Sequence, residues 1–258
     1  MFPYGYELLA IPAFIIGVIF LYKGSDVLVD GTVRIAAKLG ISALIISVLL
    51  VGFGTSSPEF AISVGAAAQG QSDISLGNIV GSCIANLFLV LGIGAIIKPI
   101  DIKKGIIKRE MPIMLLATII LFIASYVGLL DKYRIFGGIL FLVLFVLFVW
   151  FFIRCAKKER DIEKINNKDK KLKDILLIFL GIAGVVFGAY LLIESSVTIA
   201  YLFGIPEFVI AASMVAIGTS LPELVVSVMA AYKGESDVAV GNVLGSNLFH
   251  ILLVLGFA

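Results

Sequence analysis

Hydrophobic residues gather along the chain into long runs that hold few charges and are separated by polar segments. The runs lie at residues 8–29, 41–68, 74–97, 111–130, 135–153, 175–200, 205–231 and 238–258. Each run approaches or exceeds the roughly 20 residues that a helix needs to cross the hydrocarbon core of a bilayer. The pattern predicts an all-α polytopic membrane protein with about eight transmembrane helices.

The composition agrees with this fold class and excludes several others. Of the 258 residues, 60% are hydrophobic and 15% are charged, whereas a soluble domain carries about 25% charged residues. A water-soluble globule is therefore excluded. The net charge of +2 gives no support to nucleic-acid binding, so the expected surroundings of the chain are a lipid bilayer.

One polar segment, at 154–174, is much longer than the others and divides the chain into a first half at 1–153 and a second half at 175–258. We expect this segment to be a solvated loop. Nearly all Lys and Arg residues fall in the segments after the first, third, fifth and seventh predicted helices. The positive-inside rule places those segments in the cytoplasm and both chain ends outside the plasma membrane.

Two motifs occur twice, at the same spacing. Gly-Thr-Ser-Ser-Pro-Glu at 54–59 returns as Gly-Thr-Ser-Leu-Pro-Glu at 218–223, and Gly-Asn-Ile-Val-Gly-Ser at 77–82 returns as Gly-Asn-Val-Leu-Gly-Ser at 241–246. An odd number of predicted helices separates equivalent points, so the two copies must cross the membrane in opposite directions. Inverted repeats are typical of secondary transporters, whose substrate sites lie at mid-membrane between the repeats.

The repeats place one glutamate each, Glu59 and Glu223, in the middle of an apolar run. An ionised carboxylate costs at least several kcal/mol there unless a partner compensates its charge. Neither run contains a Lys or Arg, so the compensation must come from protonation, hydrogen bonds or a bound cation. A single such glutamate would fit a structural, protonated role, but a symmetric pair favours a cation site.

The prolines before these glutamates, Pro58 and Pro222, remove a helical hydrogen bond and distort the preceding turn, so each helix should break there. A broken helix exposes carbonyl oxygens at mid-membrane, beside the carboxylate. The neighbouring hydroxyls belong to Thr55, Ser56, Thr219 and Ser220. Carbonyl, hydroxyl and carboxylate oxygens are hard donors, which are the ligands that Ca²⁺ and Na⁺ prefer.

The second motif has glycines four residues apart, the spacing that lets helices pack backbone to backbone. We expect this packing for Gly77 with Gly81 and for Gly241 with Gly245.

One turn beyond the second motif of the first repeat comes Asn86, and its counterpart is His250, the only histidine of the chain. His250 has three open interpretations. It is a structural hydrogen-bonding residue, a neutral ligand through one ring nitrogen, or a group that titrates near neutral pH.

The two motifs, each present in inverted copies, resemble the repeats of the cation/Ca²⁺ exchanger superfamily. The Gly-Ser that ends the second motif resembles the prokaryotic-type Na⁺/Ca²⁺ exchanger branch. The resemblance implies ten helices arranged as five plus five, of which about eight are present before the chain stops at Ala258, so the last two are expected to be lacking.

The resemblance also implies a set of ion ligands. Glu59 and Glu223 would form a Ca²⁺ site with the carbonyls of Thr55 and Thr219. Ser56 with Ser82 and Ser220 with Ser246, helped by the carbonyls of Gly52 and Ala216, would form flanking Na⁺ sites. Asn86 and His250 would occupy the central polar positions, where family members usually carry Asn or Asp instead of the histidine.

The leading functional hypothesis is an antiporter that exchanges Na⁺ for Ca²⁺ by alternating access, with no cofactor beyond the transported ions. H⁺/Ca²⁺ exchange is the alternative within transport, and a truncated, non-transporting membrane protein is the alternative outside it. An enzyme is not expected: the chain has no His-Glu-x-x-His sequence, and a serine nucleophile would have one histidine to serve as its base.

Overall fold

The computed structural model describes residues 9–130, 133–163, 171–206 and 218–258. Every regular element in these ranges is a helix, so the all-α fold class is confirmed. The side chains of 160–163 and 171 are outside the description.

Five of the predicted runs form helices that are long and apolar enough to cross a membrane. Three of the five are single helices, and two contain a π-helical turn. They are α1 (Ala10–Leu39); α5 (Ser72–Ala85) continued by the turn Asn86–Val90 and α6 (Leu91–Ile97); α9 (Arg134–Glu163); α10 (Lys171–Leu202); and α14 (Ser236–Phe249) continued by the turn His250–Val254 and α15 (Leu255–Phe257).

The remaining runs are bent, short or partly outside the described ranges. The second run forms α2 (Ala43–Ile46), a π-helical turn Ser47–Val51 and α3 (Gly52–Thr55), and then bends by 51° into α4 (Ser57–Ala68), which makes it the sixth candidate span. The fourth forms the 17-residue α8 (Glu110–Tyr126), which the short α7 (Lys104–Lys108) precedes. The seventh contributes α13 (Leu221–Lys233), while 207–217 lie outside the description. The count of eight spans therefore stays a prediction.

The polar segment 154–174 is largely helical, contrary to the expectation of a loop. Helix α9 continues to Glu163 and α10 begins at Lys171, so the described helices leave 164–170 between them, outside the description. Lys, Arg and Glu are good helix formers, and a run of charges marks where a helix leaves the membrane but not where it ends. The first turn of α10 is anchored to α1, since the carboxylate of Asp174 pairs with Lys38 at 2.7 Å.

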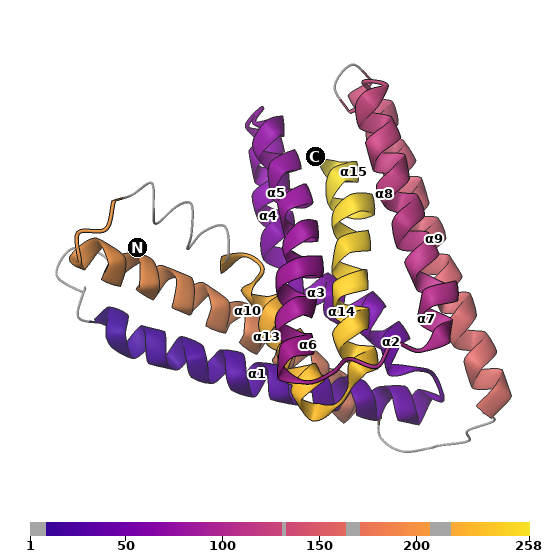
Figure 1. Ribbon diagram of the computed structural model, residues 1–258, viewed down its shortest axis with the longest axis horizontal. Coiled ribbons are helices and arrows are strands. Elements are labelled where there is room, and N and C mark those ends of the chain that lie inside the picture. Colours follow the sequence, from indigo (N-terminus) through magenta and orange to yellow (C-terminus); the bar gives the residue numbers. More distant parts are fainter. Residues whose placement is uncertain (1–8, 131–132, 164–170, 207–217) are drawn as a thin grey trace.

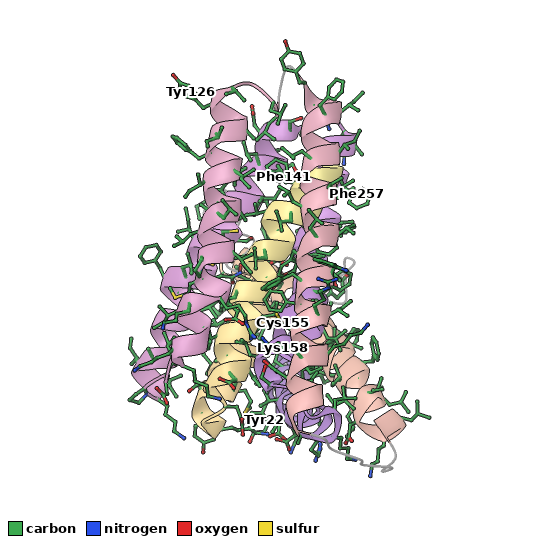
Figure 2. All side chains as sticks on the ribbon, turned by 90° about the vertical axis from the view of Figure 1, so that its right-hand side faces the viewer. Tyr22, Tyr126, Phe141, Cys155, Lys158 and Phe257 are labelled. Carbon is green, nitrogen blue, oxygen red and sulfur yellow. The ribbon has the colours of Figure 1, made fainter. Side chains whose placement is uncertain are left out.

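The helices form two groups in Figure 1. Helices α1 and α10 lie side by side across the foot of an upright group that contains α4, α5, α8, α9, α14 and α15. Helix α14 with its continuation is the central element, because 94% of its apolar stretch is buried, against 22–28% for the other four long spans. Figure 2 shows apolar side chains over the outside of the upright helices, with Tyr126 at one end and Lys158 towards the other.

The two repeats have opposite orientations, as predicted. Ser72, at the start of α5, lines a cavity together with Arg134 and Ala258 at one end of the molecule. Its counterpart Ser236, at the start of α14, accepts a hydrogen bond from the backbone N–H of Asp101 at 3.1 Å, at the opposite end. Figure 1 shows the turns that precede α5 and α14 at these opposite ends.

Helices α1 and α10 cross with their backbones in contact, because glycines line the crossing. A Cβ on Gly188 would lie 2.7 Å from the backbone nitrogen of Leu21, and one on Gly24 would lie 2.8 Å from that of Val185. Gly24 and Gly188 occupy equivalent positions of the two repeats. The crossing therefore shares the inverted two-fold relation of the repeats.

The predicted glycine packing is confirmed in the second repeat. A Cβ on Gly245 would lie 2.5 Å from the carbonyl oxygen of Val48, and one on Gly241 would lie 2.9 Å from that of Leu44. For Gly77 and Gly81 it stays a prediction, since no described atom lies within 4 Å of an added Cβ and the expected partner segment is outside the description. The segment equivalent to 44–52 in the other repeat is 208–216, and 208–216 lies outside the description.

The glycine crossing makes a stability prediction with a matched control. Gly188→Ala should lower the melting temperature in detergent, because the new methyl group meets the backbone of α1, and overpacking of this kind costs about 1–3 kcal/mol. Gly184→Ala is the control: it lies in the same helix and interface, but its Cβ would be 3.4 Å from its nearest neighbour. Equal melting temperatures for the two variants would contradict the described crossing.

Candidate cation-binding site

Each repeat contains a broken helix whose break lies just before the proline. The backbone leaves helical geometry at Ser56, with φ −81° and ψ 8°, and at Ser220, with φ −87° and ψ 6°. Pro58 and Pro222 lie in the first turn of the helices that follow, where a missing N–H leaves no helical bond unmade. The predicted break is confirmed in the first repeat, where α3 precedes Ser56; in the second repeat the segment 207–217 before the break lies outside the described residues.

The carbonyl that Pro58 deprives of a helical donor belongs to Gly54. The Ser57 hydroxyl donates a hydrogen bond to this carbonyl at 2.8 Å. The carbonyl oxygen is therefore already hydrogen-bonded in this conformation. The equivalent of Ser57 in the second repeat is Leu221, which has no hydroxyl. The two breaks thus share their backbone geometry but differ in how the freed carbonyl is satisfied.

Both glutamates begin a half-helix in the interior of the molecule. Glu59 in α4 is 1% exposed and Glu223 in α13 is 0% exposed. Each lies in the first turn, where the helix dipole favours a negative charge. The ion pairs formed by residues of the described ranges all involve other acids, so neither glutamate has a countercharge there.

Serines from both repeats meet at Glu223. The Ser56 hydroxyl donates to Oε1 of Glu223 at 2.8 Å, and the Ser246 hydroxyl lies 3.4 Å from the same oxygen. Ser246 also lies within hydrogen-bond distance, 3.3 Å, of the carbonyl of Gly52. The structure therefore brings together four of the residues that the resemblance assigned to ion sites, across the boundary between the repeats: Gly52, Ser56, Glu223 and Ser246.

The Glu59 carboxylate is less completely coordinated. Ser220, the counterpart of Ser56, lies close enough to interact with it, but neither carboxylate oxygen has a partner with the geometry of a hydrogen bond in the described part of the chain. Oε2 of Glu223 is likewise buried without a partner. Three carboxylate oxygens are therefore available to a cation.

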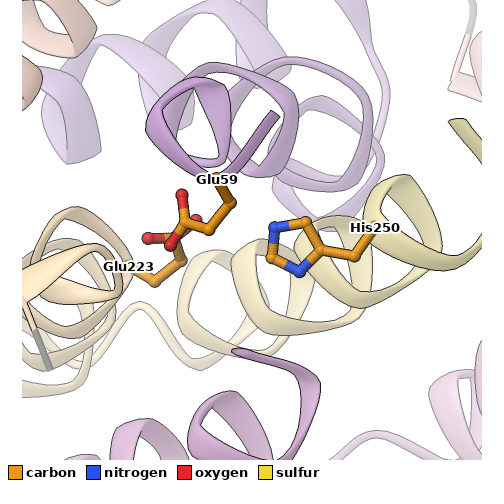
Figure 3. A group of neighbouring side chains, drawn as sticks. All are labelled: Glu59, Glu223 and His250. Carbon is orange, nitrogen blue, oxygen red and sulfur yellow. The ribbon is translucent and has the colours of Figure 1, made fainter. Parts of the chain in front are cut away.

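His250 completes a group of three potential metal ligands with the two glutamates. One ligand atom of each residue lies within 4.8 Å of the others, and Figure 3 shows the imidazole ring pointing towards the adjacent carboxylates. His250 is 0% exposed, and within the described ranges neither ring nitrogen has a hydrogen-bond partner. His250 therefore lies beside both glutamates, and its assignment as an ion ligand stays a prediction.

The counterpart of His250 is held by a residue that the sequence analysis missed. The Asn86 amide donates to Oδ1 of Asn247 at 3.0 Å, and the Asn247 amide donates to the carbonyl of Cys83 at 3.4 Å. Cys83 and Asn247 occupy equivalent repeat positions. Because their types differ, comparison of the two motifs gave no signal for Asn247.

The motif asparagines tie each broken helix to the helix that follows it. Asn242 Nδ2 donates to the carbonyl of Glu223 at 3.2 Å and to the Ser227 hydroxyl at 3.0 Å. The Thr55 hydroxyl donates to Oδ1 of the same asparagine at 3.1 Å, which joins the two repeats.

The first repeat has the equivalent contacts. Asn78 Nδ2 donates to the carbonyl of Glu59 at 3.3 Å and to the Ser63 hydroxyl at 2.9 Å. Ser63 and Ser227 were missed as supporting residues, although their identity in both copies was a signal in the sequence.

The other residues assigned by resemblance are placed as follows. Thr219 is 8% exposed and Ser82 is 5% exposed, so both belong to the buried polar interior. Ala216 lies outside the described residues. The serine pairs assigned to the flanking Na⁺ sites stay a prediction.

A membrane protein with two inverted broken helices, whose buried carboxylates converge on one centre, belongs to the class of secondary cation transporters. Residues 9–154 and 173–258 match the family model described as "Sodium/calcium exchanger protein". The chain therefore belongs to the sodium/calcium exchanger family.

Individual relatives cover nearly the whole chain. It is 35% identical over 95% of its length to "Sodium/calcium exchanger MaX1" of Methanosarcina acetivorans, covering 81% of that protein. It is 38% identical over 94% of its length to "Putative antiporter CaxA" of Alkalimonas amylolytica, covering 77% of it. A solved structure of the sodium-calcium exchanger NCX_Mj, soaked with Na⁺ and Sr²⁺, superposes with a TM-score of 0.84 at 34% identity, covering 97% of this chain and 82% of that one.

The asparagine contacts predict unequal effects for two substitutions. Asn242→Ala removes three hydrogen bonds, including the one to the Glu223 carbonyl, and buried bonds of this kind contribute about 0.5–1.5 kcal/mol each. It should lower the melting temperature and the Ca²⁺-induced rise in that temperature. Ser227→Ala, which removes one of the three contacts, is the control and should have a smaller effect on both. If Ca²⁺ stabilised the Asn242→Ala protein as much as the wild type, the role of Asn242 in holding Glu223 would be contradicted.

Proposed function

We propose that the protein exchanges Na⁺ for Ca²⁺ across the plasma membrane by alternating access, as a transporter and not an enzyme. The observation that carries this proposal is the convergence of Glu59 and Glu223, one from each inverted repeat, on a buried centre without a countercharge. Two carboxylates in that position need cations of total charge near two. One Ca²⁺ or two Na⁺ ions supply this charge equally well.

The same charge requirement accounts for coupling. With both carboxylates ionised and no cation bound, the centre holds two like charges in the membrane interior, which is costly. The loaded protein avoids that cost whichever ion it carries. A ligand shifts a conformational equilibrium by its difference in affinity for the two states, so loaded states pass between inward and outward conformations while the empty state is held back. The result is exchange with little leak.

The charged groups support the proposed orientation. Lys103 pairs with Asp237 and Arg109 with Glu159, and these pairs lie at the end of the molecule where α14 begins. By the positive-inside rule this end faces the cytoplasm. Both chain ends then belong to the extracellular side, as does Arg134, whose guanidinium contacts the backbone of Ala258.

The coupling ion is tested with purified protein in liposomes. Ca²⁺ uptake should follow an outward Na⁺ gradient and should not follow an outward proton gradient of matched size. Uptake driven by protons in the absence of Na⁺ would replace the proposal with H⁺/Ca²⁺ exchange. The absence of any cation-driven Ca²⁺ flux would favour a non-transporting membrane protein.

Removing either carboxylate charge should abolish exchange. In the same assay, Glu59→Gln and Glu223→Gln should each reduce Na⁺-driven Ca²⁺ uptake to the background of empty liposomes, because one remaining charge does not balance a divalent ion. Glu110→Gln is the control: this glutamate is also 0% exposed, but it pairs with Arg109 away from the centre, and its variant should transport. Wild-type uptake by either site variant would refute the site.

A further inference from the structure

His250 is the chemical difference between the two halves of the cation centre. Its repeat equivalent is Asn86, which offers an amide oxygen where His250 offers ring nitrogens. The π-helical turns at Asn86–Val90 and His250–Val254 place the two residues at equivalent points of their helices. The centre therefore combines a nitrogen donor on one side with an oxygen donor on the other.

The imidazole is buried without a partner in the described part of the chain. His250 is 0% exposed and neither Nδ1 nor Nε2 makes a hydrogen bond there. Buried polar atoms are nearly always hydrogen-bonded, so a ring with two free nitrogens is suited to a ligand that the protein itself does not contain. Its ligand atom faces the carboxylate oxygens of Glu59 and Glu223 and not a hydrogen donor (Figure 3).

The spacing of the three groups fits one metal ion. The ligand atoms of Glu59, Glu223 and His250 lie within 4.8 Å of one another. Two atoms bound at about 2.0–2.2 Å, the usual length of zinc bonds to nitrogen and oxygen, lie at most about 4.4 Å apart, so a small inward rotation of these side chains closes the shell around such an ion. Oδ1 of Asn86 is also buried without a partner in the described ranges, and is a candidate fourth donor. Cys83 is outside the group: its thiol lies 3.9 Å from the carbonyl of Asn247.

This donor set differs from that of a pure calcium site. Ca²⁺ takes six to eight oxygen ligands, whereas divalent ions such as Fe²⁺, Co²⁺, Ni²⁺ and Zn²⁺ bind imidazole nitrogen together with carboxylate oxygen in small coordination shells. A centre with one nitrogen and a few carboxylate and amide oxygens meets the requirements of the second group. Of the three interpretations that the sequence left open for His250, this geometry favours the neutral nitrogen ligand.

We propose that the centre also binds first-row divalent transition-metal ions, with His250 as a nitrogen ligand beside the carboxylates of Glu59 and Glu223. The ion competes with Ca²⁺ for the same carboxylates. This inference rests on the cation centre of the proposed function, and it is independent of whether Na⁺ drives transport.

Cobalt(II) is the probe for this proposal, because its visible absorption reports the number and type of its ligands. The full chain, purified in detergent with a tag free of histidine, is titrated with Co²⁺ and then with Ca²⁺. We expect a visible band of nitrogen- and oxygen-bound Co²⁺, without a thiolate charge-transfer band, that Ca²⁺ displaces. Since His250 is the only histidine of the chain, any imidazole signal comes from this residue.

His250→Asn removes the nitrogen ligand and leaves the other ligands in place. The new residue is of the same type as Asn86, which occupies the equivalent position of the first repeat. Loss of a metal-bound imidazole should weaken Co²⁺ binding by about 10–100-fold or more, and should weaken Ca²⁺ binding much less, because Ca²⁺ prefers the oxygen of an amide. His250→Asp, which restores a charged oxygen ligand, covers the case in which the first variant folds poorly. Both are checked by gel filtration. Co²⁺ affinity equal to the wild type in a folded variant would overturn the proposal.

Two further outcomes are decisive. Co²⁺ that Ca²⁺ does not displace, or that binds equally well to Glu59→Gln/Glu223→Gln protein, is bound elsewhere and overturns the proposal. Co²⁺ binding that depends on His250, in a protein that shows no Na⁺-driven Ca²⁺ uptake, upholds this inference and refutes the proposed function. The two proposals therefore fail in different experiments.

Discussion

The structure depends on bringing two carboxylates into one buried volume. Like charges in a low-dielectric interior repel strongly, and each carboxylate loses its hydration on burial. Other local features reduce this cost. The helix breaks at Ser56 and Ser220 place both acids at the positive ends of half-helices, and the Ser56 hydroxyl binds Glu223. These features leave the net negative charge of the two carboxylates uncompensated. A bound cation compensates it.

The asparagine contacts show how such a centre keeps its shape. Each glutamate lies in the first turn of the helix that follows its break, and a contact from the next helix fixes where that turn lies. Asn78 and Asn242 hold the backbone of each glutamate through its own carbonyl and so orient the side chain that follows. A glutamine or serine at these positions would place its donor at another distance from the backbone. The chemistry of the centre thus depends on residues that never touch the ion.

The features that follow from local chemistry were predictable from the sequence. Pro58 and Pro222 determine the breaks through the lost N–H, and the repeat spacing alone established the inverted arrangement. The convergence of Glu59 and Glu223 followed from their equivalent positions in repeats related by that symmetry, and the place of His250 beside them followed from its position one turn beyond the second motif.

Other features depend on tertiary contacts that one sequence does not express. Asn247 supports Asn86 only because two helices from opposite repeats meet there. Helix α9 continues past the first charges after its apolar stretch to Glu163. The hydropathy of a segment indicates whether lipid or water surrounds it, but not where its helix ends.

The π-helical turns that begin at Asn86 and His250 have a consequence for the history of the chain. A π-helical turn accommodates one residue more than the surrounding α-helix, and such turns usually arise where a single residue has been inserted. The turns at Asn86–Val90 and His250–Val254 begin at equivalent repeat positions. Independent insertions at the same point are improbable, so the ancestral half already contained the extra residue before it was duplicated. Asparagine and histidine then diverged on a backbone distortion that both copies had inherited.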